Sequence, residues 1–519
     1  MSRLASVRGE KFDVVVIGGG IIGCGVARDA AMRGLRVALF ERRDFGSGTT
    51  AASTRIVHGG LRYLERLDLR LVRMDLKERE TLLRIAPHLV EPLQFLIPFM
   101  SGAPVSALKL RLGLTLYDAL SPDTSLPRHR VLSASAARNT DGCLQREDVR
   151  GAAAYFDARV DLPERLALEN ALDAEMHQAR ILNYCEVMPP VVSDGATQRV
   201  HVRHTLDGDE AELSARLVVN ATGAWWEQVA GAQIGSPPGR IRTTKGIHIV
   251  CPALTERALV VFSAVDRRLM FAIPRSGQTW IGTTDTDYQG DPADARATRA
   301  DVDYVLASVR PMFPGLQMRD VRYTTAGVRA LVREPGRPSA VSRMHRLAAD
   351  VPSPGVISIL GGKITGYRAI AEEAVDAVCR RLKIAARCET SEKPLPGARA
   401  TSSREEAPAF LRSLYGTRAV DVMGLARIGG GLEQRLASEY PDIAAEVVFA
   451  VRSEHCRRIS DFIRRRTRLG ASADQGWSAA PRVAELMGAE LAWQPERIAE
   501  EIESYGRDIA LTTAFNGRS

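Results

Sequence analysis

The sequence lacks any run of about 18 apolar residues, so no segment is predicted to cross a membrane as a helix. Its first residues, MSRLASVRGEKFDVVVIGGG, contain no apolar signal region before the first predicted strand. The 7 cysteines are scattered, odd in number and never spaced as Cys-x-x-Cys. This pattern argues against a disulfide framework and against a metal site of the structural zinc type, and it favours a reducing compartment.

Aromatic residues are also few, at 6% of the 519 residues, and they do not alternate with the basic ones. The chain carries 70 Lys and Arg against 62 Asp and Glu, a net charge of +8. An excess of positive charge favours an anionic partner, which can be a phosphorylated small molecule, an acidic lipid surface or nucleic acid. Because the arginines are spread along the whole chain, we expect no nucleic-acid partner.

A change of composition divides the chain near residue 400. The stretch CETSEKPLPGARATSSREEAP is rich in Pro, Ser, Thr and charge, which predicts an exposed linker over residues 391–408. Residues 409–519 carry apolar residues at helical spacing with many arginines between them. We therefore expect a C-terminal all-helical domain.

Before the linker, short apolar runs stop at Gly, Pro or an acidic residue, as buried strands do. These runs are DVVVI, VALFE, LVVNATG, RLMFAIP, TWIGTTD and VISILGG. They predict an α/β fold for residues 1–390, in which a Rossmann-like nucleotide-binding domain is interleaved with a mixed-sheet substrate (cap) domain. The nucleotide-binding part spans roughly 10–80, 150–240 and 340–385, and the substrate part roughly 81–149 and 241–339.

The segment FDVVVIGGGIIGCGVARDAAMRGLRVALFE has the parts of a βαβ dinucleotide fingerprint. A strand leads into Gly18-x-Gly20-x-x-Gly23, a helix follows, and a second strand ends at Glu41. The glycines let backbone N–H groups at the helix N-terminus approach a pyrophosphate. The carboxylate of Glu41 is placed to accept hydrogen bonds from ribose hydroxyls.

Other strand-to-turn junctions favour FAD over NAD as the dinucleotide. LVVNATGAWWE ends a strand at Ala221, Thr222 and Gly223, and VISILGGKITGYR does so at Gly361 and Gly362. Junctions of this kind suggest an extended cofactor held along one sheet edge. The further residues that we expect to line the cofactor are Thr49, Thr50, Ser53 and Thr365.

These segments resemble FAD-dependent glycerol-3-phosphate dehydrogenases of the respiratory, aerobic type, in the D-amino acid oxidase-like flavoprotein group. The similar motifs, in order from residue 13 to about 470, are DVVVIGGGIIGCG, IVHGGLRYLE, NATGAW, IGTTDTDYQGDP, AGVRAL, LGGKITGYR and RRRTRLG. The resemblance implies flavin-dependent oxidation of sn-glycerol 3-phosphate to dihydroxyacetone phosphate, with the hydride passed to FAD.

The chemistry of that reaction needs a proton acceptor beside the alcohol and cations around the phosphate. By the resemblance, the substrate-binding residues are Arg62, Tyr63, Arg329, Arg343 and Lys363. It also implies catalytic roles for His58, Arg329 and Lys363, without deciding which side chain is the base. The structural alternative for His58 is a hydrogen bond to backbone in a tight loop.

The resemblance favours a membrane quinone as electron acceptor, because the chain has no large central insertion of the kind found in oxygen-using relatives. We expect a cytoplasmic protein held peripherally on the inner face of the cell membrane through anionic lipid. The sequence is also compatible with a homodimer. Arg70, Arg73 and Lys77 form a basic stripe, with apolar residues between them, that suits such a surface. Residues 106–120 are leucine-rich with a period of two, which formally predicts a strand, whereas the resemblance suggests a helix.

Two alternatives stay open. One is an oxygen-using glycerol-3-phosphate oxidase or a related FAD oxidoreductase of the same group, which would produce peroxide without added quinone. The other, of a different class, is a basic nucleic-acid-associated flavoprotein, which would bind RNA in a salt-dependent way without oxidising small alcohols.

Overall fold

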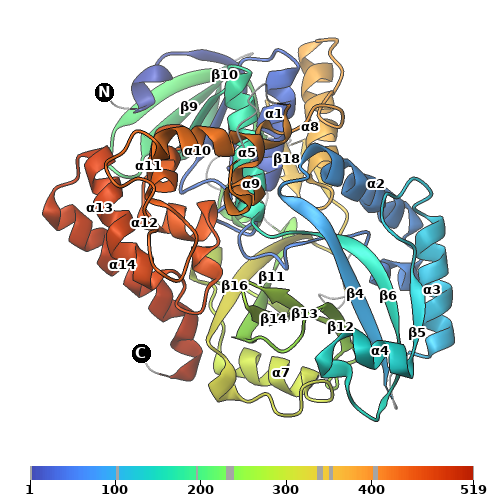
Figure 1. Cartoon of the computed structure of the whole chain (residues 1–519). Coiled ribbons are helices and arrows are strands. Elements are labelled where there is room, and N and C mark those ends of the chain that lie inside the picture. Colours follow the sequence, from blue (N-terminus) through green and yellow to red (C-terminus); the bar gives the residue numbers. More distant parts are fainter. Residues whose placement is uncertain are drawn as a thin grey trace.

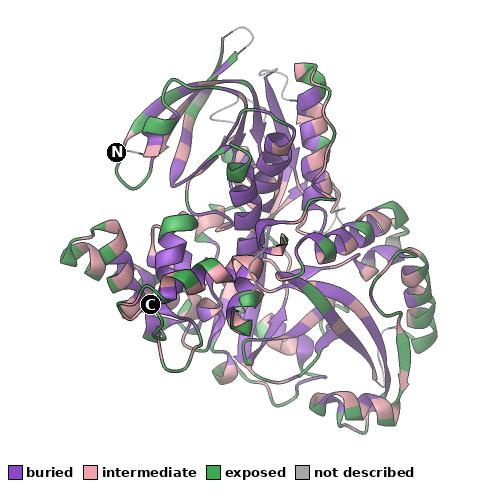
Figure 2. Cartoon of the chain, turned by 45° about the horizontal axis from the view of Figure 1, so that its top comes forward, coloured by how far each residue is buried: buried purple, intermediate pink, exposed green. Residues whose placement is uncertain are grey.

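A computed structural model of the chain describes residues 3–100, 105–194, 197–229, 239–335, 343–349, 355–400 and 407–517. One β-sheet with helices lies at the top of Figure 1, another lies at the bottom, and the C-terminal helices pack beside both. Buried residues concentrate in the sheets and in the helices between them (Figure 2). This arrangement confirms the predicted α/β fold with a helical C-terminal domain.

The first sheet has the order β17-β18-β10-β1-β2-β7. Its strands are β1 (Lys11–Ile17), β2 (Val37–Glu41), β7 (Arg180–Asn183), β10 (Glu210–Asn220), β17 (Arg346–Ala349) and β18 (Val356–Leu360). An antiparallel extension consists of β8 (Cys185–Asp194) and β9 (Thr197–His204). The pairs β1–β10, β1–β2 and β10–β18 are parallel, and their residues are buried on both faces, which is why the sequence shows continuous apolar runs.

Small residues let the helices of the first domain pack closely. α1 (Ile21–Met32) contacts both α5 (Pro163–Met176) and α8 (Tyr367–Leu382). The alanines of these helices belong to one buried cluster with the apolar residues of β1 and β2. This packing fixes the start of α1, and with it the glycine turn, relative to the sheet.

The second sheet has the order β15-β11-β14-β13-β12-β4-β6-β3, with β16 paired to β11 and β5 to β6. Its strands are β3 (Ile56–Val57), β4 (Val90–Met100), β5 (Arg130–Ser133), β6 (Val149–Val160), β11 (Ile241–Pro252), β12 (Ala258–Phe262), β13 (Leu269–Arg275), β14 (Gln278–Gly282), β15 (Thr286–Asp287) and β16 (Tyr323–Val332). The pair β12–β4 is parallel and the others are antiparallel, so the sheet is mixed. Because β6 pairs along β4, residues 150–160 lie in this sheet, which differs from the sequence-based boundary at residue 150.

Helices α2 (Leu69–Ile85), α3 (Ala107–Ala119), α4 (Ala134–Thr140) and α7 (Arg299–Val309) surround the second sheet. The segment whose period of two formally predicted a strand is the helix α3. The side chain of Ser106 caps it by accepting a hydrogen bond of 3.2 Å from the backbone N–H of Lys109. Leu114 and Tyr117, three residues apart, are buried on its inner face, so packing and capping override the short alternation.

The C-terminal domain is helical, as the sequence predicted. Its helices are α9 (Ala409–Tyr415), α10 (Ala419–Ala426), α11 (Ala444–Ser453), α12 (Ile459–Asp461), α13 (Ala480–Leu491) and α14 (Pro495–Thr513). They lie beside α5 and β16 in Figure 1, in orange and red. The domain therefore packs against both sheet domains.

The described part of the expected linker is partly packed against the first domain. Leu395 is fully buried, and its backbone N–H donates to the carbonyl of Ile85 at 2.9 Å. The buried guanidinium of Arg28 donates to the carbonyls of Thr390 and Lys393. Leu395, Pro396 and Gly397 are therefore buried, whereas Glu392, Lys393 and Ala400 are exposed as expected of a linker. Residues 401–406 lie outside the described chain.

Candidate functional site

A long pocket begins where three neighbouring parallel strands end. β1 is followed by Gly18, β10 by Ala221 and β18 by Gly361, and all three residues line the pocket. In open parallel sheets, ligands bind in the crevice outside the carboxyl ends of the strands. The strand-to-turn junctions expected from the sequence thus come together at one sheet edge, and the pocket continues from there to the second sheet.

The three glycines of the first turn are required for different structural reasons. A Cβ on Gly23 would overlap the carbonyl oxygen of Gly18 and lie 3.0 Å from its carbonyl carbon, so Gly23 allows α1 to approach the strand. Gly18 itself has a φ of +102°, which favours glycine. A Cβ on Gly20 would meet Thr50 Oγ1 only at 3.5 Å, so no protein atom demands glycine there. Gly20 lines the pocket and leaves room for a ligand to approach the backbone.

Glu41 fixes the glycine turn from the end of β2. Its Oε2 accepts the backbone N–H of Gly19 at 2.7 Å, and Oε1 accepts that of Arg43 at 2.8 Å. Burial raises the pKa of this carboxyl, and the two N–H donors oppose that rise. Each carboxylate oxygen can accept a further hydrogen bond, so the pocket-lining Glu41 remains able to accept ribose hydroxyls.

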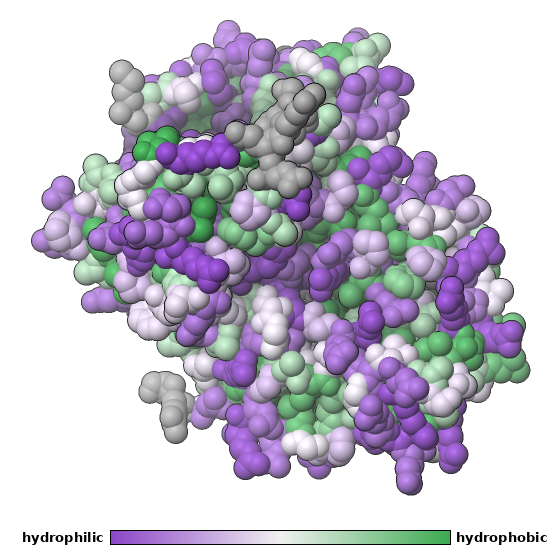
Figure 3. Space-filling model, viewed as in Figure 1, coloured by the Kyte–Doolittle hydropathy of each residue, from purple (hydrophilic) through white to green (hydrophobic). Residues whose placement is uncertain are grey.

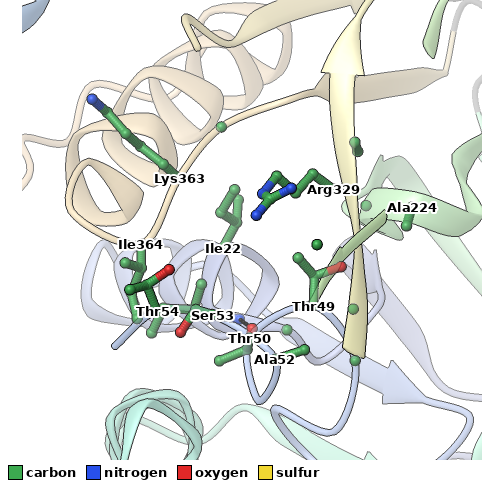
Figure 4. A pocket seen from close by; sticks show the side chains of 18 of the residues that line it. Ile22, Thr49, Thr50, Ala52, Ser53, Thr54, Ala224, Arg329, Lys363 and Ile364 are labelled. Carbon is green, nitrogen blue, oxygen red and sulfur yellow. Dashed lines mark hydrogen bonds between the residues drawn. The ribbon is translucent and has the colours of Figure 1, made fainter. Parts of the chain in front are cut away.

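A polar loop after β2 forms another wall of the pocket (Figure 4). Thr49, Thr50 and Ser53 line the pocket there. Thr222, Gly223 and Gly362 line other parts of the same pocket. The hydroxyl of Thr50 accepts the backbone N–H of Ile21, and the hydroxyl of Thr49 donates to the carbonyl of Val328. These bonds attach the loop to α1 on one side and to β16 on the other.

The structure places two of the expected cofactor residues away from the pocket wall. Gly23 lies behind it, against Gly18. Thr365 is almost fully buried, and its hydroxyl accepts the backbone N–H of His58 at 3.2 Å. Thr365 therefore holds the loop that presents His58, which does line the pocket.

The candidate phosphate-binding arginines meet at one carboxylate. Arg329 donates to Asp285 Oδ1 at 3.2 Å and Arg343 to Asp285 Oδ2 at 2.9 Å. Arg329 also donates to Thr283 Oγ1 at 2.8 Å and to the carbonyl of Thr284 at 3.1 Å. All five residues line the pocket, and they hold two guanidinium groups on its second-sheet side.

Lys363 lies across the pocket and points away from Arg329 (Figure 4). Its ammonium pairs with the buried Asp75 of α2 and lies 4.6 Å from the ring centroid of Tyr63. Burial raises the pKa of Asp75 to about 7, although Lys363 opposes the rise. Tyr63 and Lys363 are thus brought together, whereas the side chain of Arg62 lies outside the described part of the chain.

Sequence reasoning missed three residues that shape this site. Asp285 stands inside the motif IGTTDTDYQGDP, so a signal for it was present. Asp75 is one residue of an amphipathic helix, and nothing local marks it. His248 lies behind Arg329 and contacts Thr54 Oγ1 at 3.1 Å through Nε2; burial and the nearby Arg329 lower its pKa to about 3, so it is neutral.

The donor set of the pocket fits FAD. The N-terminus of α1 faces the pocket through Gly20 and Ile21, which suits the negative charge of a pyrophosphate. The turns after β10 and β18 line the same pocket, so it extends along three neighbouring strands. Within the described residues, no group of three or more His, Cys, Asp or Glu side chains could hold a metal ion.

Comparison with known proteins agrees with this geometry. The family described as FAD dependent oxidoreductase matches residues 13–368, and the C-terminal domain of alpha-glycerophosphate oxidase matches residues 388–498. The glycerol-3-phosphate dehydrogenase of Synechocystis sp. is 37% identical, with 97% of each chain covered. The aerobic glycerol-3-phosphate dehydrogenase of Staphylococcus haemolyticus is 33% identical, over 89% of this chain and 87% of its own.

A solved structure shows the same similarity. The glycerol-3-phosphate dehydrogenase from Bacillus halodurans, complexed with FAD, has a TM-score of 0.78 at 28% identity, covering 98% of this chain and 97% of that one. The matches therefore include the two sheet domains and the C-terminal helices. This chain belongs to the FAD-dependent glycerol-3-phosphate dehydrogenase family, within the D-amino acid oxidase-like flavoproteins.

Proposed function

We propose that the protein oxidises sn-glycerol 3-phosphate to dihydroxyacetone phosphate. When bound, FAD supplies the hydride acceptor for the C–H bond of the secondary alcohol. The observation that supports this substrate is the pair of arginines, Arg329 and Arg343, joined by Asp285 in the same pocket as the glycine turn. The names of the relatives described above support it further.

We assign roles to the side chains from their positions. Arg329 and Arg343 bind the phosphate, because planar guanidinium groups match pairs of phosphate oxygens. Asp285 orients both of them. His58 lines the pocket and is the candidate base for the hydroxyl proton. Lys363 also lines the pocket, but it is an ammonium held by Asp75 and by the ring face of Tyr63, so it can act there as a cation or a proton donor.

Anaerobic reduction tests this function directly. The purified protein should be yellow, and glycerol 3-phosphate should bleach its flavin absorbance without any added acceptor. Glycerol at the same concentration should bleach it far more slowly, because it lacks the phosphate that the arginines bind. A flavin-loaded protein whose spectrum does not respond to glycerol 3-phosphate would rule the substrate out.

We also propose that the electrons pass to a membrane quinone. The chain has no large central insertion, and its relatives include enzymes named aerobic glycerol-3-phosphate dehydrogenase. The reduced protein should be reoxidised much faster by a soluble quinone analogue than by dissolved oxygen. Rapid peroxide formation without quinone would instead indicate an oxidase.

Helix α3 carries a candidate site for binding to an anionic membrane surface. Leu108, Leu112 and Leu116 are exposed at intervals of four residues, which places them along one side of the helix. Lys109 and Arg111 are exposed beside them. Hydrophobic side chains gather at the right-hand edge of Figure 3, where α3 lies in Figure 1. We name these three leucines the α3 leucine face.

The basic stripe of α2 adds charge to this surface. Leu64 and Leu71 are buried, whereas Leu67, just before α2, and Leu69, its first residue, are exposed. Arg70 and Lys77 are exposed, and Arg73 pairs with Asp123 at 2.9 Å. In the described parts of the chain no helix is long and apolar enough to cross a membrane. We propose peripheral binding to the inner face of the cell membrane.

Vesicle binding separates the two contributions. Replacing Leu108, Leu112 and Leu116 with Ser should reduce binding to vesicles of anionic lipid at any salt concentration. Reversing the charge of Arg70 and Lys77 should reduce binding only at low salt, because surface charges are screened within about 10 Å at 0.1 M. Activity with a soluble dye should survive both changes. Unchanged vesicle binding in the leucine variant would remove α3 from the membrane surface.

A further inference from the structure

The C-terminal domain reaches both sheet domains through one short segment. Residues 462–471, which include the motif RRRTRLG, form a π-helical turn (Phe462–Arg466) and then a 3-10 turn (Leu469–Ala471). We name this segment the arginine strap. Arg465 and Arg466 bind Asp44 of the first domain, and Arg468 binds Asp161, directly after β6. The carbonyl of its last residue, Ala471, contacts the second sheet.

At one end, the strap neutralises a fully buried carboxylate. Arg466 donates to both oxygens of Asp44, at 2.6 and 2.9 Å, and Arg465 donates to Oδ2 at 2.7 Å. The side chain of Asn183 adds a hydrogen bond of 3.0 Å to Oδ1. Burial raises the pKa of Asp44, but the guanidiniums lower it to about 2, so the carboxylate stays ionised. An acid this deep in the protein depends on those two arginines.

Asp44 belongs to the loop that supports the glycine turn. The loop, residues 42–46, follows β2 directly. The N–H of Gly46 donates to the carbonyl of Gly19 at 2.8 Å, and Phe45 packs so closely that a Cβ on Gly19 would lie 2.7 Å from its ring. Arg42 and Arg43 of the same loop line the pocket. The position of Asp44 therefore sets the backbone that faces the dinucleotide.

At the other end, the strap is linked to the polar wall of the pocket. Arg468 donates to Asp161 Oδ2 at 2.8 Å, and Arg275 of β13 donates to Oδ1 at 2.6 Å. The carbonyl of Asp161 accepts Arg55 at 2.9 Å, and Arg55 lines the pocket beside Thr54.

The strap also binds the second sheet directly. The carbonyl of Ala471 accepts hydrogen bonds from Gln278 of β14, at 2.6 Å, and from the hydroxyl of Tyr323 in β16, at 3.0 Å. Residues far apart in sequence, from both sheet domains, are therefore bound to the same ten-residue segment. A displacement of the strap would disturb the supports of both sides of the pocket together.

We infer that the C-terminal domain retains FAD: Arg465 and Arg466 hold Asp44, and Asp44 holds the loop that keeps the glycine turn ready for the dinucleotide. A site that is already ordered loses less conformational freedom when its ligand binds, and the ligand is bound more tightly. Without its two arginines, Asp44 would be a buried unpaired charge, and the loop of residues 42–46 would rearrange to expose it. Asp44, Arg465 and Arg466 are thus positioning residues for the cofactor.

The release of FAD from the holoenzyme tests this inference. Asp44→Asn keeps the shape of the side chain but removes the charge that the strap binds. On dilution of the holoenzyme, free-flavin fluorescence should appear at least about tenfold faster in this variant than in the parent protein. Excess FAD should restore the flavin absorbance spectrum, because the pocket-lining residues are unchanged.

Glu169→Gln is the matched control. Glu169 is fully buried in α5, its carboxylate lies 3.8 Å from Arg418 of the C-terminal domain, and it contacts His88 at 3.2 Å. None of these residues belongs to the arginine strap or to the loop of residues 42–46. This variant should melt at a lower temperature than the parent protein and yet release FAD at a rate within about twofold of it.

Arg465→Lys covers the case in which Asp44→Asn does not fold. Lysine keeps the charge but cannot bridge Asp44 and Asp461 as Arg465 does. It should speed FAD release by a smaller factor than Asp44→Asn. Parental release rates in both Asp44→Asn and Arg465→Lys would overturn the inference. Equal acceleration in Glu169→Gln would overturn it as well, because that result would assign FAD retention to domain packing in general.

Discussion

A single methyl group at Gly246 should displace the arginine that we assign to the phosphate. Gly246 lies in β11, opposite Gly327 of β16, and its φ is not in the left-handed region, so the backbone accepts alanine. A Cβ there would lie 2.5 Å from Cζ and Nη1 of Arg329, and closer still to Nη2. These atoms are the end of a flexible side chain. The arginine, rather than the sheet, must therefore move.

The size of the effect follows from the bonds that the guanidinium would lose. In its present position Arg329 donates to Thr283, Thr284 and Asp285, which together aim it into the pocket. A charge-assisted hydrogen bond contributes about 1.5–3 kcal/mol. At about 1.36 kcal/mol for each factor of ten, the loss of one such bond to phosphate lowers kcat/KM roughly 10- to 150-fold. Gly246→Ala should show a loss in this range with glycerol 3-phosphate.

Dye-linked kinetics with two substrates measure the effect. Glycerol carries no phosphate, so its slow turnover should be nearly the same in Gly246→Ala and in the parent protein. FAD content and melting temperature should also be close to parental, because Gly246 lies outside the glycine turn and only a side-chain tip moves. Equal losses on both substrates, or an unchanged KM for glycerol 3-phosphate, would refute the reasoning and separate Arg329 from the phosphate.

Further substitutions test other parts of the site. Arg329→Lys should lower kcat/KM for glycerol 3-phosphate about tenfold or more and leave glycerol turnover unchanged, since lysine keeps the charge but loses the paired bonds. Gly20→Val should fold normally and lack FAD. Gly23→Ala should lower the melting temperature of the protein even without FAD, because the added Cβ at residue 23 meets Gly18 rather than a ligand. Identical behaviour of the two variants would contradict these roles. The pKa of Asp75 is raised from its ordinary value of 3.8 to about 7 in the folded state, so the folded protein binds a proton there more tightly than the unfolded chain does. The resulting contribution to the free energy of unfolding is complete below pH 3.8 and is lost as the pH rises through about 7. Asp75→Asn should therefore remove up to about 4 kcal/mol of the decline in unfolding free energy between pH 4 and 8 in urea titrations, and an unchanged pH profile would show that Asp75 is ionised throughout.

The sequence by itself determined the parts of this protein that depend on local backbone geometry. The strand, the glycine turn and the helix from Lys11 to Met32 follow from apolar runs and from positions that only glycine can occupy. The same local rules predicted β10 and β18 with their turns, and the helical C-terminal domain. The resemblance of ordered motifs then indicated the family, and the comparisons confirmed it.

Only the tertiary structure decided which distant charges meet. Asp75 pairs with Lys363 across 288 residues, and Arg466 pairs with Asp44 across 422. An acidic residue has the same helical or loop propensity whether its partner is solvent or a buried cation, so no local pattern distinguishes these acids from surface ones. The same holds for α3, whose alternating leucines are compatible with a strand until Leu114 and Tyr117 pack against the protein. Burial, which depends on the whole fold, is what turns such a charge into a buried ion pair with a specific partner.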